Sequence, residues 1–283
     1  MRALEALRRH WPEYLIEAWA LGTFMIAAGA VGTLLAYPGS PLHAAFPDPT
    51  LRRVLAGLAM GTTAIALIYS PWGKRSGAHM NPAVTLTFLR LGKVRGWDAV
   101  FFIAAQFIGG TLGVLLIAAI AGMAFTAPPV NYVATLPAPS ADGMSSAVGT
   151  AFAAEAVISA VLMLAVLIVS SSKRFAPFTG IVAGCLVALY ISVEEPLSGM
   201  SMNPARTFAS AAPAMHWQHL WLYFTAPVLG MLTGAQIFLA LRGARQIACA
   251  KLLHPADQRC IHCGYEPDPS AAAAGATAQL RSI

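Results

Sequence analysis

The sequence predicts an all-α membrane protein that crosses the bilayer several times. Hydrophobic residues make up 57% of the 283 positions, whereas charged residues make up only 11%. A soluble domain carries about 25% charged residues, so this chain has too little charge to cover a water-facing surface. Disorder is excluded as well, because it requires low hydrophobicity and high net charge. The length accommodates about six or seven spans of about 20 residues each, joined by short connections.

Six long apolar runs are the predicted spans, and Pro- and Gly-rich stretches separate them. The runs lie at residues 14–36, 51–70, 98–124, 148–170, 177–193 and 217–241. Two further apolar stretches, 82–91 and 204–215, are about half as long, and Asn-Pro lies at the start of each. They are too short to cross a hydrocarbon core of about 30 Å. The sequence therefore predicts two re-entrant half-helices beside the six spans.

The basic residues predict the orientation of the chain. When the N-terminus is placed inside, 15 of the 18 Lys and Arg residues fall on the inner side, and the loops 37–50 and 125–147 contain none. This distribution follows the positive-inside rule, with both termini in the cytoplasm and the spans in the cell membrane. Arg52 and Arg53 at the outer mouth of the second span are a mild exception. The net charge of +6 therefore indicates orientation and not a nucleic-acid partner.

The two halves of the chain repeat each other. Residues 76–85 (SGAHMNPAVT) resemble residues 198–207 (SGMSMNPART), which lie 122 positions later. Each half contains three spans, and this odd number makes the repeat inverted, which places a pathway near the midplane between the halves. The predicted organisation is an N-terminal segment 1–12, a first repeat 13–124, an outer connecting loop 125–147, a second repeat 148–242 and a tail 243–283.

Asn81-Pro82 and Asn203-Pro204 predict the starts of the half-helices, because Asn is a favoured N-cap and Pro fits the first helical position. The two N-termini would meet at the midplane, where each carries about half a positive charge. This charge opposes cations, including hydronium. The Asn amides can hold one passing oxygen and interrupt proton hopping, and Arg206 adds a fixed positive charge one turn further on.

Three other residues near the motifs have a predicted role. Glu17 and Glu155 open the first and fourth spans, and we expect each carboxylate to accept hydrogen bonds from loop N–H groups. A proton relay is the alternative for an intramembrane carboxylate. His79 precedes Asn81 by two positions, and it either lines the inner vestibule through its carbonyl or anchors the loop.

These motifs resemble the aquaporin, or major intrinsic protein, family. The resemblance rests on two Asn-Pro-Ala motifs, an Arg three residues after the second Asn, and a Glu at the start of each half, and it covers residues 12–242. It implies six spans with two half-helices in a lipid bilayer, assembled as a homotetramer with one pore per subunit. It also implies a bacterial-type passive channel for water or small neutral solutes.

Two alternatives stay open beside a water channel. One is a broader facilitator for glycerol, urea, ammonia or peroxide, and the other is a non-conducting structural member of the fold. An enzyme is not expected, since the spans contain no metal-binding His pair, no nucleophile elbow and no phosphate-binding Gly-rich loop.

The resemblance also implies a selectivity filter on the outer side of the paired motifs. Carried across by spacing, its residues are Arg206, Met200 and Ile191, with one more from the second span. Straight counting gives Gly61 for that position, whereas one extra residue in the following loop gives Met60.

This filter fits neither main subclass of the family. Water-selective members usually show an aromatic residue from the second span and a His from the fifth, and glycerol facilitators an Asp after the Arg, where this chain has Thr207. The filter is therefore atypical, and we expect water together with some small uncharged solutes to pass.

The tail carries a separate motif. Two residues separate Cys260 from Cys263, and Gly follows, which resembles one knuckle of a zinc ribbon; His254 lies upstream. Cys and His are the usual ligands of tetrahedral zinc, but these three make an incomplete site. Three interpretations stay open: a zinc site, a redox or oligomer-bridging Cys pair, and a disordered tail without a cofactor.

Overall fold

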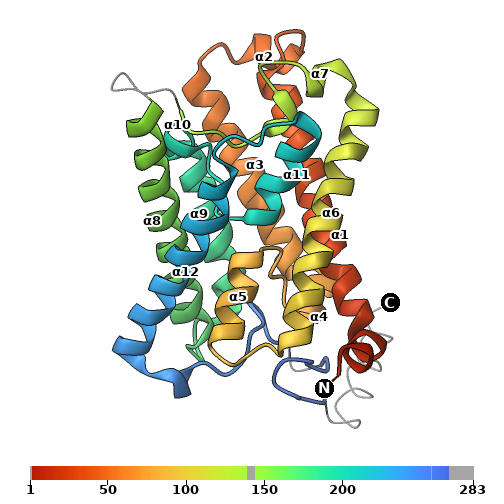
Figure 1. The fold of residues 1–283 in the computed structure, drawn as a ribbon, viewed down its shortest axis with the longest axis vertical. Coiled ribbons are helices and arrows are strands. Elements are labelled where there is room, and N and C mark those ends of the chain that lie inside the picture. The colour runs from red at the N-terminus through yellow and green to blue at the C-terminus, as the bar shows by residue number, and fades with distance from the viewer. Residues whose placement is uncertain (1, 139–143, 256, 268–283) are drawn as a thin grey trace, which may run out of the picture.

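The structure, a computed structural model, describes residues 2–138, 144–255 and 257–267 (Figure 1). In this part of the chain, six helices are long and apolar enough to cross a membrane. They are α1 (Ala3–Ala36), α3 (Pro49–Tyr69), α6 (Gly96–Ala121), α8 (Met144–Ser170), α9 (Thr179–Val193), which is counted together with the preceding turn Ala176–Phe178, and α12 (Leu220–Arg242). They surround α5 (Pro82–Arg90) and α11 (Pro204–Ala214). The predicted all-α membrane fold is confirmed.

Short elements lie at the two ends of the bundle. They are the helices α2 (Pro41–Ala45), α4 (Pro71–Ser76), α7 (Met123–Thr126) and α10 (Glu195–Ser198), and the 3-10 turns η1 (Asn131–Val133), η2 (Ala176–Phe178) and η3 (Ala244–Gln246). In Figure 1, α2, α7 and α10 mark the upper end of the bundle, and α4 and residues 243–267 mark the lower end.

The first helix is longer than the sequence predicts. The segment 1–12 is expected to precede the first span, but α1 begins at Ala3 and runs without interruption to Ala36. The ion pair between Arg9 Nη2 and Glu5 Oε1 (3.3 Å) follows the i,i+4 spacing that supports a helix. His10 Nδ1 lies 2.7 Å from Asp98 Oδ1 on α6, which ties the first turns of α1 to the bundle.

The packing of the helices repeats between the two halves of the chain. α1 packs along α6 as α8 packs along α12, and α3 of the first half packs against α9 of the second. Each half-helix packs on the last span of the opposite half, α5 on α12 and α11 on α6. The halves are therefore interlocked, and neither half-helix is supported by its own repeat alone.

Glycines allow the closest of these helix contacts. A Cβ atom at Gly109 would overlap the backbone of Ala18 in α1, and a Cβ atom at Gly230 would overlap the backbone of Ala156 in α8. The two positions are equivalent in the repeat. Small residues at helix interfaces let backbones approach in this way, which is the main route to helix packing in lipid.

The outer surface of the bundle is apolar. On α6, Leu112, Leu116 and Ile120 lie on one helical face and are 60%, 51% and 71% exposed. Soluble monomers rarely expose contiguous apolar surface of this kind. The face is instead suited to the hydrocarbon core of a bilayer, as expected for a multi-pass membrane protein.

Candidate functional site

A cavity of about 510 Å³ lies inside the bundle between the two halves of the chain. Its wall includes Pro49 and Arg52 near the upper end, and Leu252, a residue of the tail, near the lower end. Most of its lining is apolar and comes from α1, α3, α8 and α9. Among its few polar residues are Asn81, Asn203 and Arg206, so the predicted motif residues share one cavity.

The two Asn side chains join the half-helices by crossed hydrogen bonds. Asn81 accepts from the N–H of Ala83 with Oδ1 (2.8 Å), which caps α5, and donates from Nδ2 to the carbonyl of Met202 (2.7 Å). Asn203 caps α11 in the same way and donates from Nδ2 to the carbonyl of Met80 (2.7 Å). Each amide nitrogen carries two hydrogens, so a second donor remains on each side chain beside the cavity.

The loops that lead into the half-helices have a strained backbone at matching positions. Ala78 and Met80 have φ values of 54° and 50°, and Met200 and Met202 have φ values of 48° and 52°. A residue with a side chain in this left-handed region costs on the order of 1–3 kcal/mol, and persists only where its surroundings hold it. Pro82 and Pro204 then occupy the first turns of α5 and α11.

Glu17 holds the first of these loops. Its carboxylate accepts from the Ser76 hydroxyl (2.7 Å), from the N–H groups of His79 (3.1 Å) and Met80 (2.6 Å), and from Gln106 Nε2 (2.9 Å). The side chain is fully buried. Such charge-assisted bonds are about twice as strong as neutral ones, which offsets the cost of the strained loop.

Glu155 holds the second loop with the same pattern. It accepts from the Ser198 hydroxyl (2.8 Å) and from the N–H groups of Ser201 (2.7 Å) and Met202 (2.7 Å). The contacts that the sequence predicts for both glutamates are therefore present.

Four predicted filter residues line the cavity: Met60, Ile191, Met200 and Arg206. Gly61 does not line it. A Cβ atom at Gly61 would lie 2.5 Å from the Gly184 carbonyl oxygen in α9, so this glycine serves the contact between α3 and α9. Of the two positions that the spacing leaves open, Met60 therefore lines the cavity and Gly61 does not.

Arg206 makes no direct ion pair with the acidic residues of the upper end in the part of the chain that the structure describes. Its Nη1 atom is buried and has no hydrogen-bond partner among the described residues, and no ion pair joins it to Glu194 or Glu195 in this part of the chain. Glu195 instead lies 3.8 Å from Arg53. Burial raises the pKa of Glu194 to about 7 and raises that of Glu195 as well, which weakens negative charge at the upper mouth.

The two exceptions to the positive-inside pattern have local partners. Arg52 donates from Nη1 to the carbonyls of Phe46 (2.7 Å) and Pro47 (2.9 Å), and Arg53 donates from Nε to the carbonyl of Ser192 (3.0 Å). Arg52 therefore fixes loop carbonyls and Arg53 fixes the last turn of α9 at the upper end, where both side chains also line the cavity.

His79 connects the first loop to the tail. Its ring is buried at the lower end of the cavity, donates from Nε2 to the carbonyl of Ala250 (2.9 Å), and places Nδ1 3.1 Å from Thr85 Oγ1. The sequence allows His79 either to line the inner vestibule or to anchor the loop. In the structure its ring anchors the loop, and the residue also lies on the cavity wall. His262 donates from Nε2 to the carbonyl of Ser76 (3.0 Å), and burial lowers its pKa to about 4.

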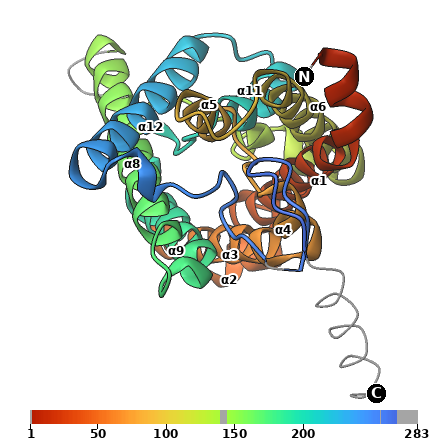
Figure 2. The same cartoon turned by 90° about the horizontal axis from the view of Figure 1, so that it is seen from below.

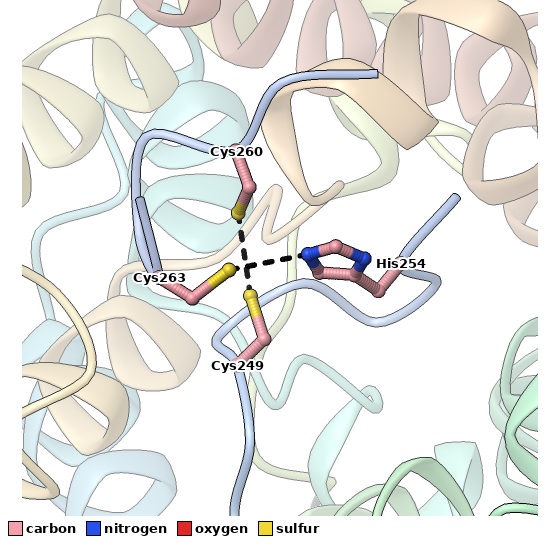
Figure 3. A group of neighbouring side chains, drawn as sticks. All are labelled: Cys249, His254, Cys260 and Cys263. Atoms are coloured by element: carbon pink, nitrogen blue, oxygen red, sulfur yellow. Dashed lines mark hydrogen bonds between the residues drawn. The ribbon is translucent and has the colours of Figure 1, made fainter. Parts of the chain in front are cut away.

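The structure brings the tail motif together with a residue that the sequence pattern does not reveal. Cys249, His254, Cys260 and Cys263 point toward one centre (Figure 3), and their ligand atoms all lie within 4.8 Å of one another. Cys249 is the missing fourth member. Its signal in the sequence is its position, five residues before His254, although it forms no Cys-x-x-Cys pair.

The fold and the site together define a class of protein. Two half-helices meet N-terminus to N-terminus in a cavity between inverted repeats, which is the architecture of a membrane channel. The sequence comparison then names the family: residues 8–238 match the family described as Major intrinsic protein. The chain belongs to this family, as its motifs predict.

Named relatives agree with this assignment. The chain is 38% identical over 181 residues to "Probable aquaporin AqpM" of Archaeoglobus fulgidus, covering 63% of this chain and 71% of the relative. It is 29% identical over 241 residues to "Aquaporin Z" of Photorhabdus laumondii, covering 82% and 98%. The solved structure of the aquaglyceroporin from Plasmodium falciparum is similar in fold, with a TM-score of 0.61, 20% identity and coverage of 81% and 95%.

Proposed function

We propose that this chain is a passive channel for water and small uncharged solutes, and that it excludes protons and ions. The supporting observation is the crossed junction of Asn81 and Asn203 on the wall of a cavity that reaches from Arg52 to Leu252. The junction brings two helix N-termini together in the cavity. Their partial positive charges oppose a cation while costing a neutral solute little.

Proton exclusion follows from the donors at the junction. Each Asn uses one amide hydrogen in the crossed bond, and the second remains to donate to a passing oxygen. A water molecule held by two donors points its own hydrogens away from them. A continuous chain of waters that relays a proton is then interrupted at this point.

The solute range follows from the filter. Met60, Ile191 and Met200 are apolar, and Arg206 supplies a charge and an unpartnered Nη1 donor. A ring that is apolar on three sides favours solutes with a hydrocarbon part and a polar group, such as glycerol, beside water. The broader neutral-solute facilitator is therefore the second candidate, supported by the same four residues.

Stopped-flow light scattering on proteoliposomes is the decisive test, with water, glycerol, urea and ammonia measured in parallel. We expect water flux and at least one solute flux severalfold above empty liposomes, with no rise in proton flux read by an internal pH dye. Water flux with glycerol, urea and ammonia all excluded would overturn the proposed solute range.

Substitution at the junction tests the site itself. Asn203→Asp keeps the cap on α11 but replaces the donor to Met80 with a negative charge, and we expect lower water flux and a raised cation leak. Asn131→Asp is the matched control, because Asn131 lies outside the cavity wall. Osmotic swelling that is the same in Asn203→Asp and the parent would favour the non-conducting structural role instead.

We also infer the assembly and the setting of the channel. Basic residues concentrated at the lower end support a cytoplasmic location for both termini in the cell membrane. Family membership supports a homotetramer in which each subunit holds its own pore. Neither proposal involves a nucleic acid or an enzymatic activity.

A further inference from the structure

We propose that Cys249, His254, Cys260 and Cys263 bind one Zn²⁺ ion, and that this ion holds Leu252 across the lower mouth of the cavity. The metal site stands on the tail alone. The closure rests on the proposed channel function, and the experiments below separate the two parts.

The distances within the cluster fit a tetrahedral ion. Zn–S and Zn–N bonds of about 2.3 and 2.0–2.1 Å place ligand atoms about 3.5–3.8 Å apart in a tetrahedron. Cys249 Sγ lies 3.4 Å from Cys260 Sγ, and His254 Nε2 lies 3.2 Å from Cys263 Sγ. All pairs lie within 4.8 Å, so small shifts complete the geometry. The Cys249–Cys260 separation is also too long for a disulfide, whose S–S bond is about 2.0 Å.

The donor set selects the kind of metal. Three thiols and one imidazole form the Cys₃His set of structural zinc sites, whereas Ca²⁺ and Mg²⁺ require oxygen ligands. Cys260 is buried while His254 and Cys263 are exposed. The ion would therefore be covered on the side of the channel and reachable from solvent on the other.

The backbone around the thiols is already shaped for a metal knuckle. The N–H of Lys251 points to Cys249 Sγ (3.5 Å), a contact that orients a thiolate ligand. After Cys263 the chain turns back: Gly264 donates to the carbonyl of Cys260 (3.0 Å), and Cys260 donates to the carbonyl of Tyr265 (2.8 Å). Gly264 has a φ of 74°, which glycine adopts without a steric cost.

The cluster is attached to the loop that leads into α5. Three contacts make the attachment: Leu252 donates to the carbonyl of Gly77 (3.2 Å), His79 donates to the carbonyl of Ala250, and His262 donates to the carbonyl of Ser76. Viewed from below, the tail crosses the lower end of the bundle (Figure 2). The metal site and the first re-entrant loop thus form one unit.

Leu252 connects this unit to the cavity. Its side chain lines the cavity, is only 7% exposed, and packs in the same apolar cluster as Ala78 and Val84 of the first motif. It lies between the ligands Cys249 and His254, so an ion bound by both fixes the two ends of the short stretch that carries it. The segment 247–255 contains no helix or strand of its own. Small segments without a sufficient core depend on such a staple, and here its loss would free Leu252.

Metal content tests the first part. We expect the purified full-length chain to carry one zinc ion by elemental analysis, and its Co²⁺ form to show the intense visible bands of a tetrahedral thiolate site. Cys249→Ser and Cys263→Ser should lose most of the zinc. Cys185→Ser is the matched control, because Cys185 lies on α9 away from the cluster and should keep the zinc content unchanged.

Three results would overturn the metal site. They are zinc near zero in the parent chain, octahedral cobalt spectra, and a Cys249–Cys260 disulfide found by mass spectrometry of the untreated protein. Retention of a full zinc ion by the Cys249→Ser variant would overturn the assigned ligand set.

Permeability tests the closure. We expect a membrane-permeant zinc chelator to raise solute flux in proteoliposomes severalfold, and added Zn²⁺ to restore the lower flux. Leu252→Ala should raise flux while it keeps its zinc. Leu253→Ala is the matched control, because Leu253 packs at the edge of the same cluster but does not line the cavity.

The two parts fail separately. A chain that binds zinc, conducts, and shows the same flux with and without the chelator would overturn the closure and leave both the metal site and the channel. A chain that binds zinc but conducts nothing in any form, Leu252→Ala included, would overturn the proposed channel and the closure together, while the zinc content would still establish the metal site.

Discussion

Arg206 takes part in the cap of α11 through its backbone and lines the cavity with its side chain. Its backbone N–H bonds to Asn203 Oδ1 (3.2 Å) and belongs to the cap of α11, while its side chain brings an unpartnered Nη1 to the cavity wall. In the proposed channel we expect the charge to repel cations and the planar fork of donors to replace part of the hydration shell of a neutral solute. Arg206 would then contribute to selection by both size and charge.

Two substitutions at this position separate its roles. Arg206→Ala removes both charge and bulk, and we expect glycerol and urea flux to rise and proton flux to become measurable. Arg206→Lys keeps the charge but loses the fork, so proton exclusion should persist while the ratio of solute to water flux changes. Equal proton flux in the parent and in Arg206→Ala would show that the junction of Asn81 and Asn203 is sufficient for exclusion.

Residues differ in how far the sequence alone reveals them. Asn81, Asn203 and Arg206 are predictable because each belongs to a short motif whose geometry is local to a helix start. The filter residue of α3 is predicted only as Gly61 or Met60, because its position depends on the length of the loop that follows α3. Cys249 is not predictable. The fold of the tail brings it to the other three residues, and no fixed spacing in the sequence indicates this.

At the element scale, the tightest helix crossings depend on glycines, which have no side chain to hold the two backbones apart. Gly230 on α12 meets the backbone of Ala156 on α8, whereas a Cβ atom at Gly149, also within α8, would have no neighbouring atom within 4 Å. Replacing Gly by Ala should therefore change the free energy of unfolding in opposite directions at the two positions. In a helix with free space, replacing Gly by Ala gains about 0.8–1 kcal/mol from backbone entropy.

We expect Gly230→Ala to lower the free energy of unfolding by about 1–3 kcal/mol, the usual cost of overpacking a close contact. Gly149→Ala should leave stability unchanged or raise it. Thermal unfolding in one detergent, followed by circular dichroism and by light scattering, compares the pair. A gain of the same size in both variants would mean that helix propensity, and not the close crossing, sets the stability.

At the scale of the whole molecule, the sequence predicts the spans and half-helices well but their partners poorly. The apolar runs and the two motifs indicate six spans and two helix starts, and the structure has them. The packing of α5 on α12 and of α11 on α6 joins residues far apart in the chain, and no local pattern contains that information. The continuation of α1 to Ala3 escapes prediction for a related reason, since Asp98 on α6 holds its first turns.

The assembly and orientation lead to a prediction for the intact protein. We expect native mass spectrometry from mild detergent to show a mass of four chains, and a protease added to sealed right-side-out vesicles to leave the tail uncut. A dimer or monomer under all conditions would contradict the proposed tetramer. Cleavage within residues 243–267 in sealed vesicles would contradict the cytoplasmic tail.

The crossed hydrogen bonds between Asn81 and Asn203 also bear on how the channel is made. The carbonyl of Met80 and the amide of Asn81 find their partners only at positions 202 and 203, about 120 residues later in synthesis. Without the second half, the first re-entrant loop would be incompletely bonded, and its strained residues Ala78 and Met80 would keep only their bonds to Ser76 and Glu17. We therefore expect the first half to reach its final bonding only after the second half is in place, so that a chain cut between the repeats keeps an unfinished re-entrant loop.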